Sequence, residues 1–311
     1  MPTMKKLIIL GSGPAGLTAA IYAGRAGLAP IVLDGPSPGG PLITTPLIEN
    51  YPGFAEGIAG FELMDIMRKQ ATRFGATFQS ASLTSMTPRP TGGADLTLAD
   101  GTTVTADALI IATGANHRKL GLPGEDELSG RGLSYCATCD GAFHRGEHIA
   151  VVGGGDTAME EALFLTRFAS QVTLIHRRDA FRASKIMGQR VLDNPKITVR
   201  WDSIISALHD PAQGKLTALT LKNVKTGKEG KVEVGALFVA IGLVPASQPF
   251  ANVLETDENG YLVTQGVTTK LPGVFVAGDI ADSRYRQAVT AAGQGCRAAI
   301  EAMHYLERAN A

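Results

Sequence analysis

The sequence has few cysteines, no net charge and no long apolar run. Three cysteines among 311 residues are too few for the disulfide framework of a small secreted domain. Basic and acidic residues balance at 29 each, and the absence of a long basic run argues against a nucleic-acid partner. No apolar stretch reaches membrane-spanning length, and Leu7–Leu10 is too short for a signal-peptide core. We therefore expect a soluble, cytoplasmic protein with no nucleic-acid or membrane partner.

What the sequence does contain is enough apolar material for two buried cores. A chain of this length suits two domains, and 44% of its residues are apolar. One pattern occurs twice: an aliphatic strand, a glycine-rich turn, a helix and a second strand. The first copy spans Leu7–Leu33 and the second spans Ile149–Ile175. This repetition predicts two βαβ units with parallel strands.

The end of the chain is predicted to return to the first unit. A strand at Val274–Val276 and a helix at Ala288–Leu306 are too short to form a domain of their own. The sequence thus predicts an α/β fold of two Rossmann-like, three-layer dinucleotide-binding domains, one inserted into the other. The first domain comprises 1–117 and 247–311, and the inserted domain comprises 118–246. Glycine and proline near 115–122 and 242–247 suit hinges at the two crossings.

Each glycine-rich turn is a candidate site for a dinucleotide. In the pattern Gly-x-Gly-x-x-Gly/Ala, the first glycine permits the turn, the second admits a pyrophosphate, and the third position packs helix on strand. The following helix presents free N–H groups to the phosphates. The candidate residues are Gly11, Gly13, Pro14, Ala15 and Gly16 in the first turn, and Gly153, Gly155, Asp156 and Thr157 in the second.

Equivalent positions after the two turns differ in charge. Asp34 ends the second strand of the first unit, where a carboxylate accepts hydrogen bonds from a ribose. His176, Arg177 and Arg178, with Arg182 further on, stand in the second unit, where arginines bind a 2′-phosphate. The second site is therefore predicted to take NADPH rather than NADH. The alternative is that Arg177 and Arg178 are an ordinary exposed pair.

A Cys-x-x-Cys pair lies just before the second unit. Cys136 and Cys139 are three residues apart, which lets them share a helix face and form a disulfide. A helix start favours a thiolate, and Asp140 can supply or relay a proton. Zinc is the main alternative for this motif, but it needs two more ligands, and the remaining cysteine, Cys296, lies in an apolar helix. We predict redox chemistry, with Cys136, Cys139 and Asp140 as catalytic residues.

With these motifs in place, the chain resembles the low-molecular-weight thioredoxin reductases of the bacterial type over nearly its whole length. Further segments carry the resemblance, namely Glu49–Gly53, Ala112–Gly114, Ala277–Asp279 and Arg286–Ala288. The resemblance implies FAD in the first domain, NADPH in the inserted domain and a homodimer. It also implies electron transfer from NADPH through FAD and the Cys136–Cys139 pair to thioredoxin, with rotation of the inserted domain between the half-reactions.

The resemblance also implies roles for individual residues. Cys139 faces the flavin, Cys136 attacks the protein substrate, and Asp140 is the acid. Residues implied in FAD binding, beside the first turn and Asp34, are Gly40, Thr45, Asn50, Thr113, Gly114, Gly278, Asp279, Arg286, Gln287 and Ala288. One position departs from the family. Pro41 stands where glutamine is common, so a contact to FAD through that amide or side chain is absent or replaced.

Other functions fit part of these observations. The dithiol could serve a peroxiredoxin-type carrier or a small-molecule dithiol, although the arginines at 177–182 favour NADPH use. A redox-sensing flavin module would carry the same turns but show no turnover. A ferredoxin-dependent reductase would not need the intact second glycine motif.

Overall fold

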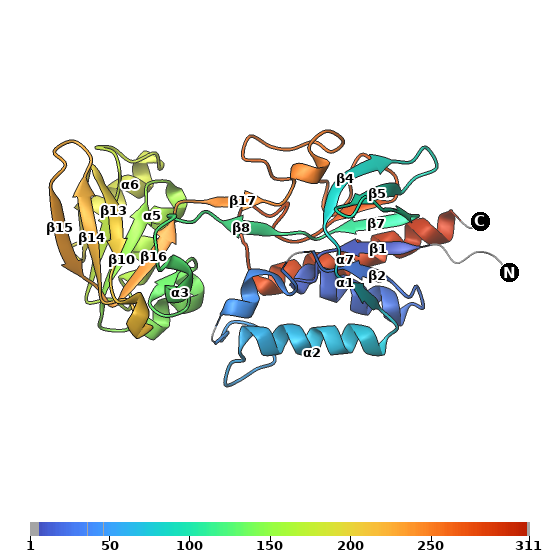
Figure 1. The fold of residues 1–311 in the computed structure, drawn as a ribbon, viewed down its shortest axis with the longest axis horizontal. Coiled ribbons are helices and arrows are strands. Elements are labelled where there is room, and N and C mark those ends of the chain that lie inside the picture. The colour runs from blue at the N-terminus through green and yellow to red at the C-terminus, as the bar shows by residue number, and fades with distance from the viewer. Residues whose placement is uncertain (1–5, 36, 46, 310–311) are drawn as a thin grey trace. The chain divides into compact units, whose positions relative to one another are not determined.

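A computed structural model of the chain describes residues 6–309 except 36 and 46. The chain divides into two compact units. Unit 1 comprises Met1–Asn116 and Val244–Ala311, and unit 2 comprises His117–Leu243 (Figure 1). Each unit is described by itself below.

The centre of unit 1 is a five-stranded parallel sheet. Its strand order is β18 (Val274–Val276), β7 (Ala108–Ile111), β1 (Leu7–Leu10), β2 (Ile31–Leu33) and β3 (Thr77–Gln79). Strand β1 is aliphatic at every position because it is buried on both faces. Leu7 and Ile9 enter one core, and Ile8 and Leu10 enter another on the opposite face.

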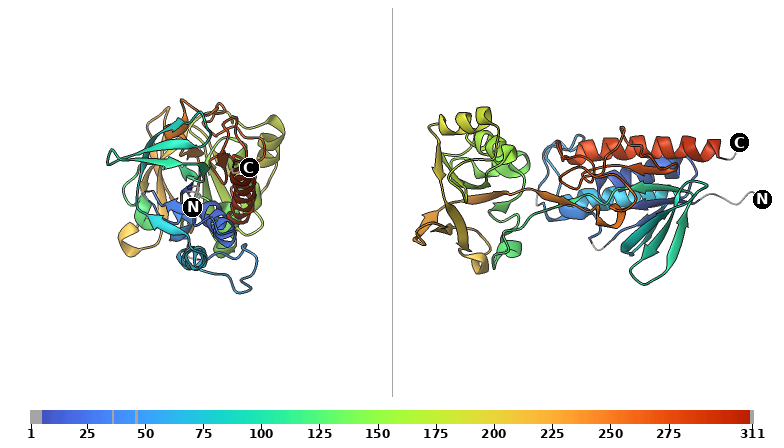
Figure 2. Two further views of the ribbon diagram at one scale, coloured as in Figure 1. Left: turned by 90° about the vertical axis from the view of Figure 1, so that its right-hand side faces the viewer. Right: turned by 90° about the horizontal axis from the view of Figure 1, so that it is seen from above.

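Helices cover one face of this sheet and a small antiparallel sheet covers the other. Helices α1 (Pro14–Arg25) and α7 (Ala288–Arg308) contribute to the first core, and α2 (Gly60–Arg73) packs against α1 (Figure 2). Strands β4 (Leu83–Pro88), β5 (Ala94–Leu98) and β6 (Thr103–Ala106) contribute to the second core. Helices α1 and α7 approach so closely that a Cβ on Gly295 would lie 2.1 Å from the carbonyl oxygen of Ala15.

Unit 2 repeats the three-layer plan. Its parallel sheet has the order β12 (Ile197–Arg200), β11 (Gln171–Ile175), β10 (His148–Gly153), β16 (Ala236–Ala240) and β9 (Leu133–Ser134). Helices α5 (Asp156–Leu165) and α6 (Lys185–Leu192) share a core with one face of the sheet. The antiparallel strands β13 (Ser203–Leu208), β14 (Ala218–Asn223) and β15 (Glu229–Glu233) form the third layer on the other face.

The two chain connections between the units run as paired short strands. They are β8 (Ala115–His117) and β17 (Leu243–Pro245). The short helices that position the candidate site in unit 2 are α3 (Glu125–Leu128), α4 (Ala137–Asp140) and the 3₁₀ turn η2 (Gly141–His144). Two parallel-sheet units with one inserted into the other confirm the predicted fold class. Among the described residues, no helix is both long and apolar enough to cross a membrane.

Candidate functional site

The first glycine turn joins β1 to α1 and is open where a phosphate would lie. Gly16 has no room for a side chain, because its Cβ would lie 1.9 Å from the carbonyl oxygen of Gly11. At Gly13 a built Cβ would meet, beyond its chain neighbours, only the carbonyl oxygen of Gly39 at 4.0 Å, so a group can approach this backbone without a clash. Gly13 caps α1 without a side-chain hydrogen bond, and Pro14 begins the helix. The turn therefore fits a pyrophosphate held by backbone N–H groups.

The carboxylate of Asp34, at the end of β2, is already paired with an arginine. Arg68 on α2 donates to both carboxylate oxygens over 2.9–3.0 Å, and its guanidinium lies 3.8 Å from the centroid of the Phe78 ring. The Asp34 side chain is only 5% exposed. A carboxylate has more acceptor positions than this pair uses, so a ribose hydroxyl can share it. Arg68 was not identified from the sequence, because nothing in a helix pattern says which arginine reaches a strand end.

Asp279 follows β18 in a second acidic position of unit 1. Burial, and to a lesser degree the charge of Asp282, raise the pKa of Asp279 to about 6, while Arg286 acts in the opposite direction. The N–H of the preceding Gly278 donates to the side chain of Gln294 over 2.6 Å. A largely buried carboxyl that forms no salt bridge among the described residues suits a ligand that brings hydroxyl donors, as a ribityl chain does.

The other residues implied in FAD binding lie on loops of unit 1, and hydrogen bonds tie several of these loops together. The N–H of Gly39, before the 3₁₀ turn η1 (Gly40–Thr44), donates to the Ser12 hydroxyl of the first glycine turn. Asn50 donates to Gln287 over 3.4 Å. The other residues implied in FAD binding fall into three groups. They are Gly40, Thr45 and Asn50 in and after η1, Thr113 and Gly114 after β7, and Arg286, Gln287 and Ala288 at the start of α7.

The second glycine turn, between β10 and α5, is held against the arginine-bearing segment. At Gly155 no heavy atom of the described residues, apart from the two chain neighbours, lies within 4 Å of a built Cβ, so this turn is open. The backbone N–H of Arg182 donates to the carbonyl of Gly154 over 2.8 Å. Asp156 accepts from both the N–H and the hydroxyl of Ser184. These bonds keep Arg182 beside the turn.

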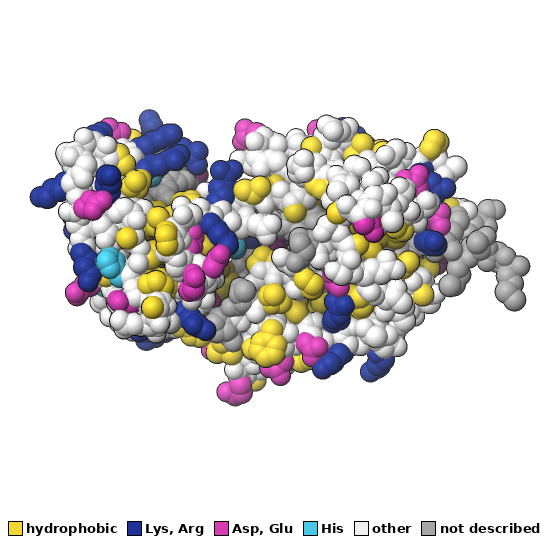
Figure 3. All heavy atoms as spheres, in the orientation of Figure 1, with side chains coloured by type: hydrophobic (Ala, Val, Ile, Leu, Met, Phe, Trp, Pro, Cys, Tyr) yellow, Lys and Arg dark blue, Asp and Glu magenta, His cyan; other side chains and the backbone are white. Residues whose placement is uncertain are grey.

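The three arginines are available to a ligand, whereas the neighbouring histidine is not. Arg177, Arg178 and Arg182 are exposed, and basic side chains gather on part of the unit 2 surface (Figure 3). His176 is buried; its Nε2 lies 3.0 Å from the carbonyl oxygen of Ala180, and burial lowers its pKa. The imidazole occupies the space that a side chain at Gly154 would need. The His176 ring therefore packs against the backbone of the second glycine turn at Gly154.

Cys136 and Cys139 form a disulfide at the start of α4. Their Cα atoms are 5.3 Å apart. The N–H groups of Cys139 and Asp140 both donate to the carbonyl of Cys136, and this single turn brings the two sulfurs together. Both cysteines are partly exposed, so a sulfur of this pair is accessible to a second protein.

Asp140 lies behind the disulfide in a largely buried position. Burial raises its pKa, while a hydrogen bond from Ser134 and the charge of His144 lower it. Ser134 donates to Asp140 Oδ2 over 2.6 Å and accepts from the N–H of Cys136 over 3.1 Å. A raised pKa suits a carboxyl that donates a proton near neutral pH. The sequence does not indicate that Ser134 reaches Asp140, since that distance depends on how β9 ends.

A second carboxylate of unit 2 was missed in the sequence. Glu125 is 3% exposed and accepts from the N–H groups of Leu120 and Gly121 and from the hydroxyl of Tyr135. Burial, with the bond to Glu125, raises the pKa of Tyr135. The Tyr135 ring stacks on His117, with centroids 4.9 Å apart. Glu125 therefore ties the segment after β8 to the residue just before Cys136.

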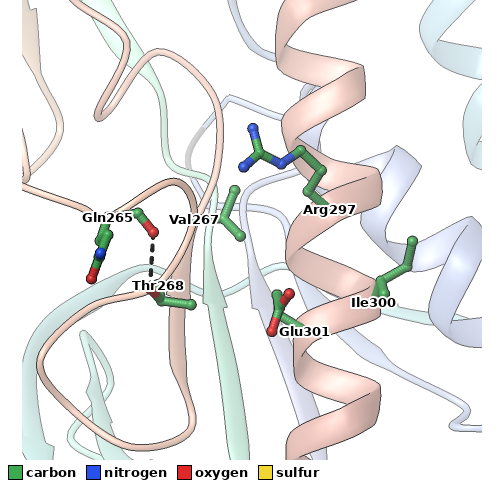
Figure 4. A pocket seen from close by; sticks show the side chains of 6 residues that line it. All are labelled: Gln265, Val267, Thr268, Arg297, Ile300 and Glu301. Carbon is green, nitrogen blue, oxygen red and sulfur yellow. Dashed lines mark hydrogen bonds between the residues drawn. The ribbon is translucent and has the colours of Figure 1, made fainter.

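Two hollows on unit 1 differ in their relation to the candidate site. One, of about 160 Å³, lies between α7 and the loop before β18, and its lining is Gln265, Val267, Thr268, Arg297, Ile300 and Glu301 (Figure 4). It contains none of the predicted site residues. The other, of about 540 Å³, is formed by the loop Glu49–Ala55 and includes Asn50.

Comparisons with known proteins agree with this arrangement. Residues 5–295 match the family described as pyridine nucleotide-disulphide oxidoreductase. Thioredoxin reductase of Streptomyces clavuligerus is 50% identical, with 98% of this chain and 95% of that protein covered. That of Mycolicibacterium smegmatis is 52% identical, with 98% and 97% covered. The crystal structure of thioredoxin reductase from Streptococcus pyogenes superposes with a TM-score of 0.92 at 38% identity, covering 99% of this chain and 100% of the other. The chain therefore belongs to the pyridine nucleotide-disulphide oxidoreductase family, among its thioredoxin reductases.

Proposed function

We propose that this chain is an NADPH-dependent flavoprotein that reduces the disulfide of thioredoxin. The observation that carries the proposal is the partly exposed Cys136–Cys139 disulfide with the buried carboxyl of Asp140 directly behind it. The two open glycine turns supply the nucleotide sites that such a reductase needs. The curated relatives described above share this activity by name.

The residues of unit 1 fit FAD and those of unit 2 fit NADPH. In unit 1, the turn Gly11–Gly16, Asp34 and Asp279 would hold the pyrophosphate, the ribose and the ribityl chain. In unit 2, the turn Gly153–Ala158 would hold the second pyrophosphate, with Arg177, Arg178 and Arg182 on the 2′-phosphate. The chemistry that FAD supplies when bound is two-electron transfer between NADPH and the Cys136–Cys139 pair.

The dithiol then reduces thioredoxin in two exchanges. The Cys136 thiolate attacks one sulfur of the thioredoxin disulfide; a mixed disulfide forms, and the departing thiolate takes a proton from Asp140. Cys139 gives its proton to the Asp140 carboxylate and attacks the Cys136 sulfur. The Cys136–Cys139 bond forms again, and the second thioredoxin sulfur leaves with that proton. Two electrons and two protons have passed to thioredoxin.

Three further features belong to the proposal. The dithiol exchanges electrons within the protein in one half-reaction and with a bulky protein in the other, and one rigid arrangement does not serve both. We therefore include rotation of unit 2 about β8 and β17. A homodimer and a cytoplasmic location follow from the resemblance. Sedimentation of the FAD-loaded protein would test the homodimer.

The test is NADPH oxidation followed with a panel of thioredoxin-like proteins, peroxiredoxin-type carriers and small disulfides. The proposal expects rapid, thioredoxin-dependent oxidation by a yellow protein and none by the Cys136→Ser variant. Turnover with a small disulfide but not with any thioredoxin would assign the chain to another substrate. NADPH binding without any turnover would instead indicate a sensor.

A further inference from the structure

The hydroxyl of Ser134 lies at the meeting point of the acid and the attacking cysteine. Ser134 ends β9 and is 6% exposed. Its Oγ is 2.6 Å from Asp140 Oδ2, 3.1 Å from the backbone nitrogen of Cys136 and 3.4 Å from the carbonyl oxygen of Cys136. Three polar partners thus surround one hydroxyl in a nearly closed position.

These three partners match the bonding capacity of a hydroxyl in both protonation states of Asp140. A serine hydroxyl donates one hydrogen bond and accepts two. When Asp140 is ionised, Ser134 donates to Oδ2 and accepts from the N–H of Cys136. When Asp140 is protonated, its O–H donates to Oγ, the Cys136 N–H still donates to Oγ, and the serine hydrogen turns toward the Cys136 carbonyl. The Asp140 carboxyl can therefore keep Ser134 as its hydrogen-bond partner, and keep its position, in both the ionised and the protonated state.

The other surroundings of Asp140 offer it little else. Oδ1 is buried and has no hydrogen-bond partner among the described residues. The charged neighbour that affects its pKa is His144 on η2, which pairs with Glu147 over 2.7 Å. Helix α5, packed against α4, carries Asp156, Glu160 and Glu161, and the reduced pair adds the thiols of Cys136 and Cys139. Among the described residues, Ser134 is the side chain that hydrogen-bonds to the Asp140 carboxyl itself.

We propose that Ser134 is a positioning residue that holds the Asp140 carboxyl in place in both of its protonation states and fixes it to the backbone of Cys136. The inference rests on the proposed thioredoxin reduction, because the proton moved by Asp140 is the one taken by the departing thioredoxin thiolate. Ser134 touches neither the substrate nor the reacting sulfurs. Its effect passes through Asp140.

The proposal predicts a specific change in the pH dependence of turnover. Without the Ser134 hydroxyl both forms of the Asp140 carboxyl lose a hydrogen bond. The ionised form loses more, because a hydrogen bond to a charged group is the stronger one, so Asp140 keeps its proton to higher pH. In Ser134→Ala, the limb of the pH profile that Asp140→Asn abolishes should move upward by about one pH unit, the size expected for the difference between a charged and a neutral hydrogen bond. Ser134→Thr keeps a hydroxyl and should keep the profile of the parent. Ser206→Ala, which removes a hydroxyl bonded to the Thr220 carbonyl in the same unit, is the matched control and should also leave it unchanged.

A second measurement does not depend on thioredoxin. The infrared band of the protonated carboxyl, assigned by its loss in Asp140→Asn, can be titrated in the holoprotein of each variant, with Ser134→Gly as a second hydroxyl deletion if Ser134→Ala does not fold. An upward shift in the deletion variants, absent from Ser134→Thr and Ser206→Ala, supports the inference even if the chain turns out to serve another disulfide. An unshifted titration in a folded deletion variant overturns it, whatever the substrate.

Discussion

The half-exposed guanidinium of Arg68 forms a two-pronged ion pair with the buried carboxylate of Asp34 at the end of β2. The guanidinium donates three hydrogen bonds of 2.9–3.0 Å to the carboxylate and lies over the Phe78 ring. Bidentate geometry fixes the direction of the carboxylate as well as its charge. Asp34 is thereby prepared as an acceptor for the ribose that we assign to it.

Removal of the Arg68 guanidinium should weaken both the fold of unit 1 and FAD binding. In Arg68→Met the Asp34 carboxylate stays buried without its partner, which should lower the free energy of unfolding by about 1–3 kcal/mol. Urea denaturation and FAD retention on dilution would measure the two effects. Lys69→Met removes only an exposed pair with Asp65 and should change neither. Equal behaviour of the two variants would contradict the assignment.

Arg177→Ala should separate the two nicotinamide cofactors. A hydrogen bond to a charged group contributes about 1.5–3 kcal/mol, so kcat/KM for NADPH should fall about tenfold or more. The value for NADH should hardly change, because NADH lacks the 2′-phosphate. Arg190→Ala, another exposed arginine of unit 2, is the control. Parallel losses with NADPH and NADH would mean that Arg177 supports the fold instead.

The two cysteines should differ in what they trap. Cys139→Ser leaves Cys136 to attack thioredoxin but removes the thiol that resolves the adduct, so a stable mixed disulfide should accumulate. Cys136→Ser should give much less of it. Peptide mapping by mass spectrometry identifies the linked cysteine. Adducts mapped to Cys139 alone would reverse the roles we assign.

The raised pKa of Asp279 predicts a pH-dependent stability in the FAD-free protein. Because its folded-state pKa of about 6 exceeds the ordinary value of 3.8, the folded state favours the protonated carboxyl. The stabilisation is complete below about pH 4 and is lost as the pH rises through about 6. The neutral variant Asp279→Asn should therefore gain stability relative to the parent as the pH rises, by about 3 kcal/mol at pH 7 and above. Urea denaturation at several pH values tests this, and a constant difference between pH 4 and 8 would refute it. The same variant should retain less FAD.

Glu125→Gln should destabilise unit 2 far more than the same change at an exposed neighbour. The amide replaces one acceptor oxygen by a donor that faces backbone N–H groups, at a cost of about 2–4 kcal/mol. Glu127→Gln, on the same short helix but exposed, should have almost no effect. Chemical denaturation of both variants gives the comparison, and a stable Glu125→Gln protein would show that the segment after β8 is held by other contacts.

The fold was predictable from the sequence wherever a periodic pattern coincided with a fully buried element. The repeated strand, turn and helix at Leu7–Leu33 and Ile149–Ile175 identified both parallel sheets, because a strand buried on two faces is aliphatic throughout. The predicted strand Val274–Val276 agrees with β18, and the predicted helix Ala288–Leu306 extends two residues further in α7. The family is confirmed by the comparisons.

The site was only partly predictable, because some partners depend on distances that a sequence does not contain. Short motifs identified Cys136 and Cys139, whose disulfide the structure contains. Arg68, Ser134 and Glu125 have no motif, and each meets its partner only after separate elements have packed. The cofactor contacts of the other predicted residues stay predictions that the variants above would test.

The packing of α7 against α1, where Gly295 approaches Ala15, has a consequence for the order in which the two units can fold during synthesis. The sheet of unit 1 lacks β18 and its first core lacks α7 until the last segment of the chain has been synthesised, whereas unit 2 is continuous and complete at Leu243. On the ribosome, unit 2 can therefore form all its internal contacts before unit 1, whose two segments flank it in the sequence, can do so. Until α7 is synthesised, we expect the first segment of unit 1 to expose the apolar surface that α7 later covers. This segment is therefore the part of the nascent chain that we expect to need a chaperone most.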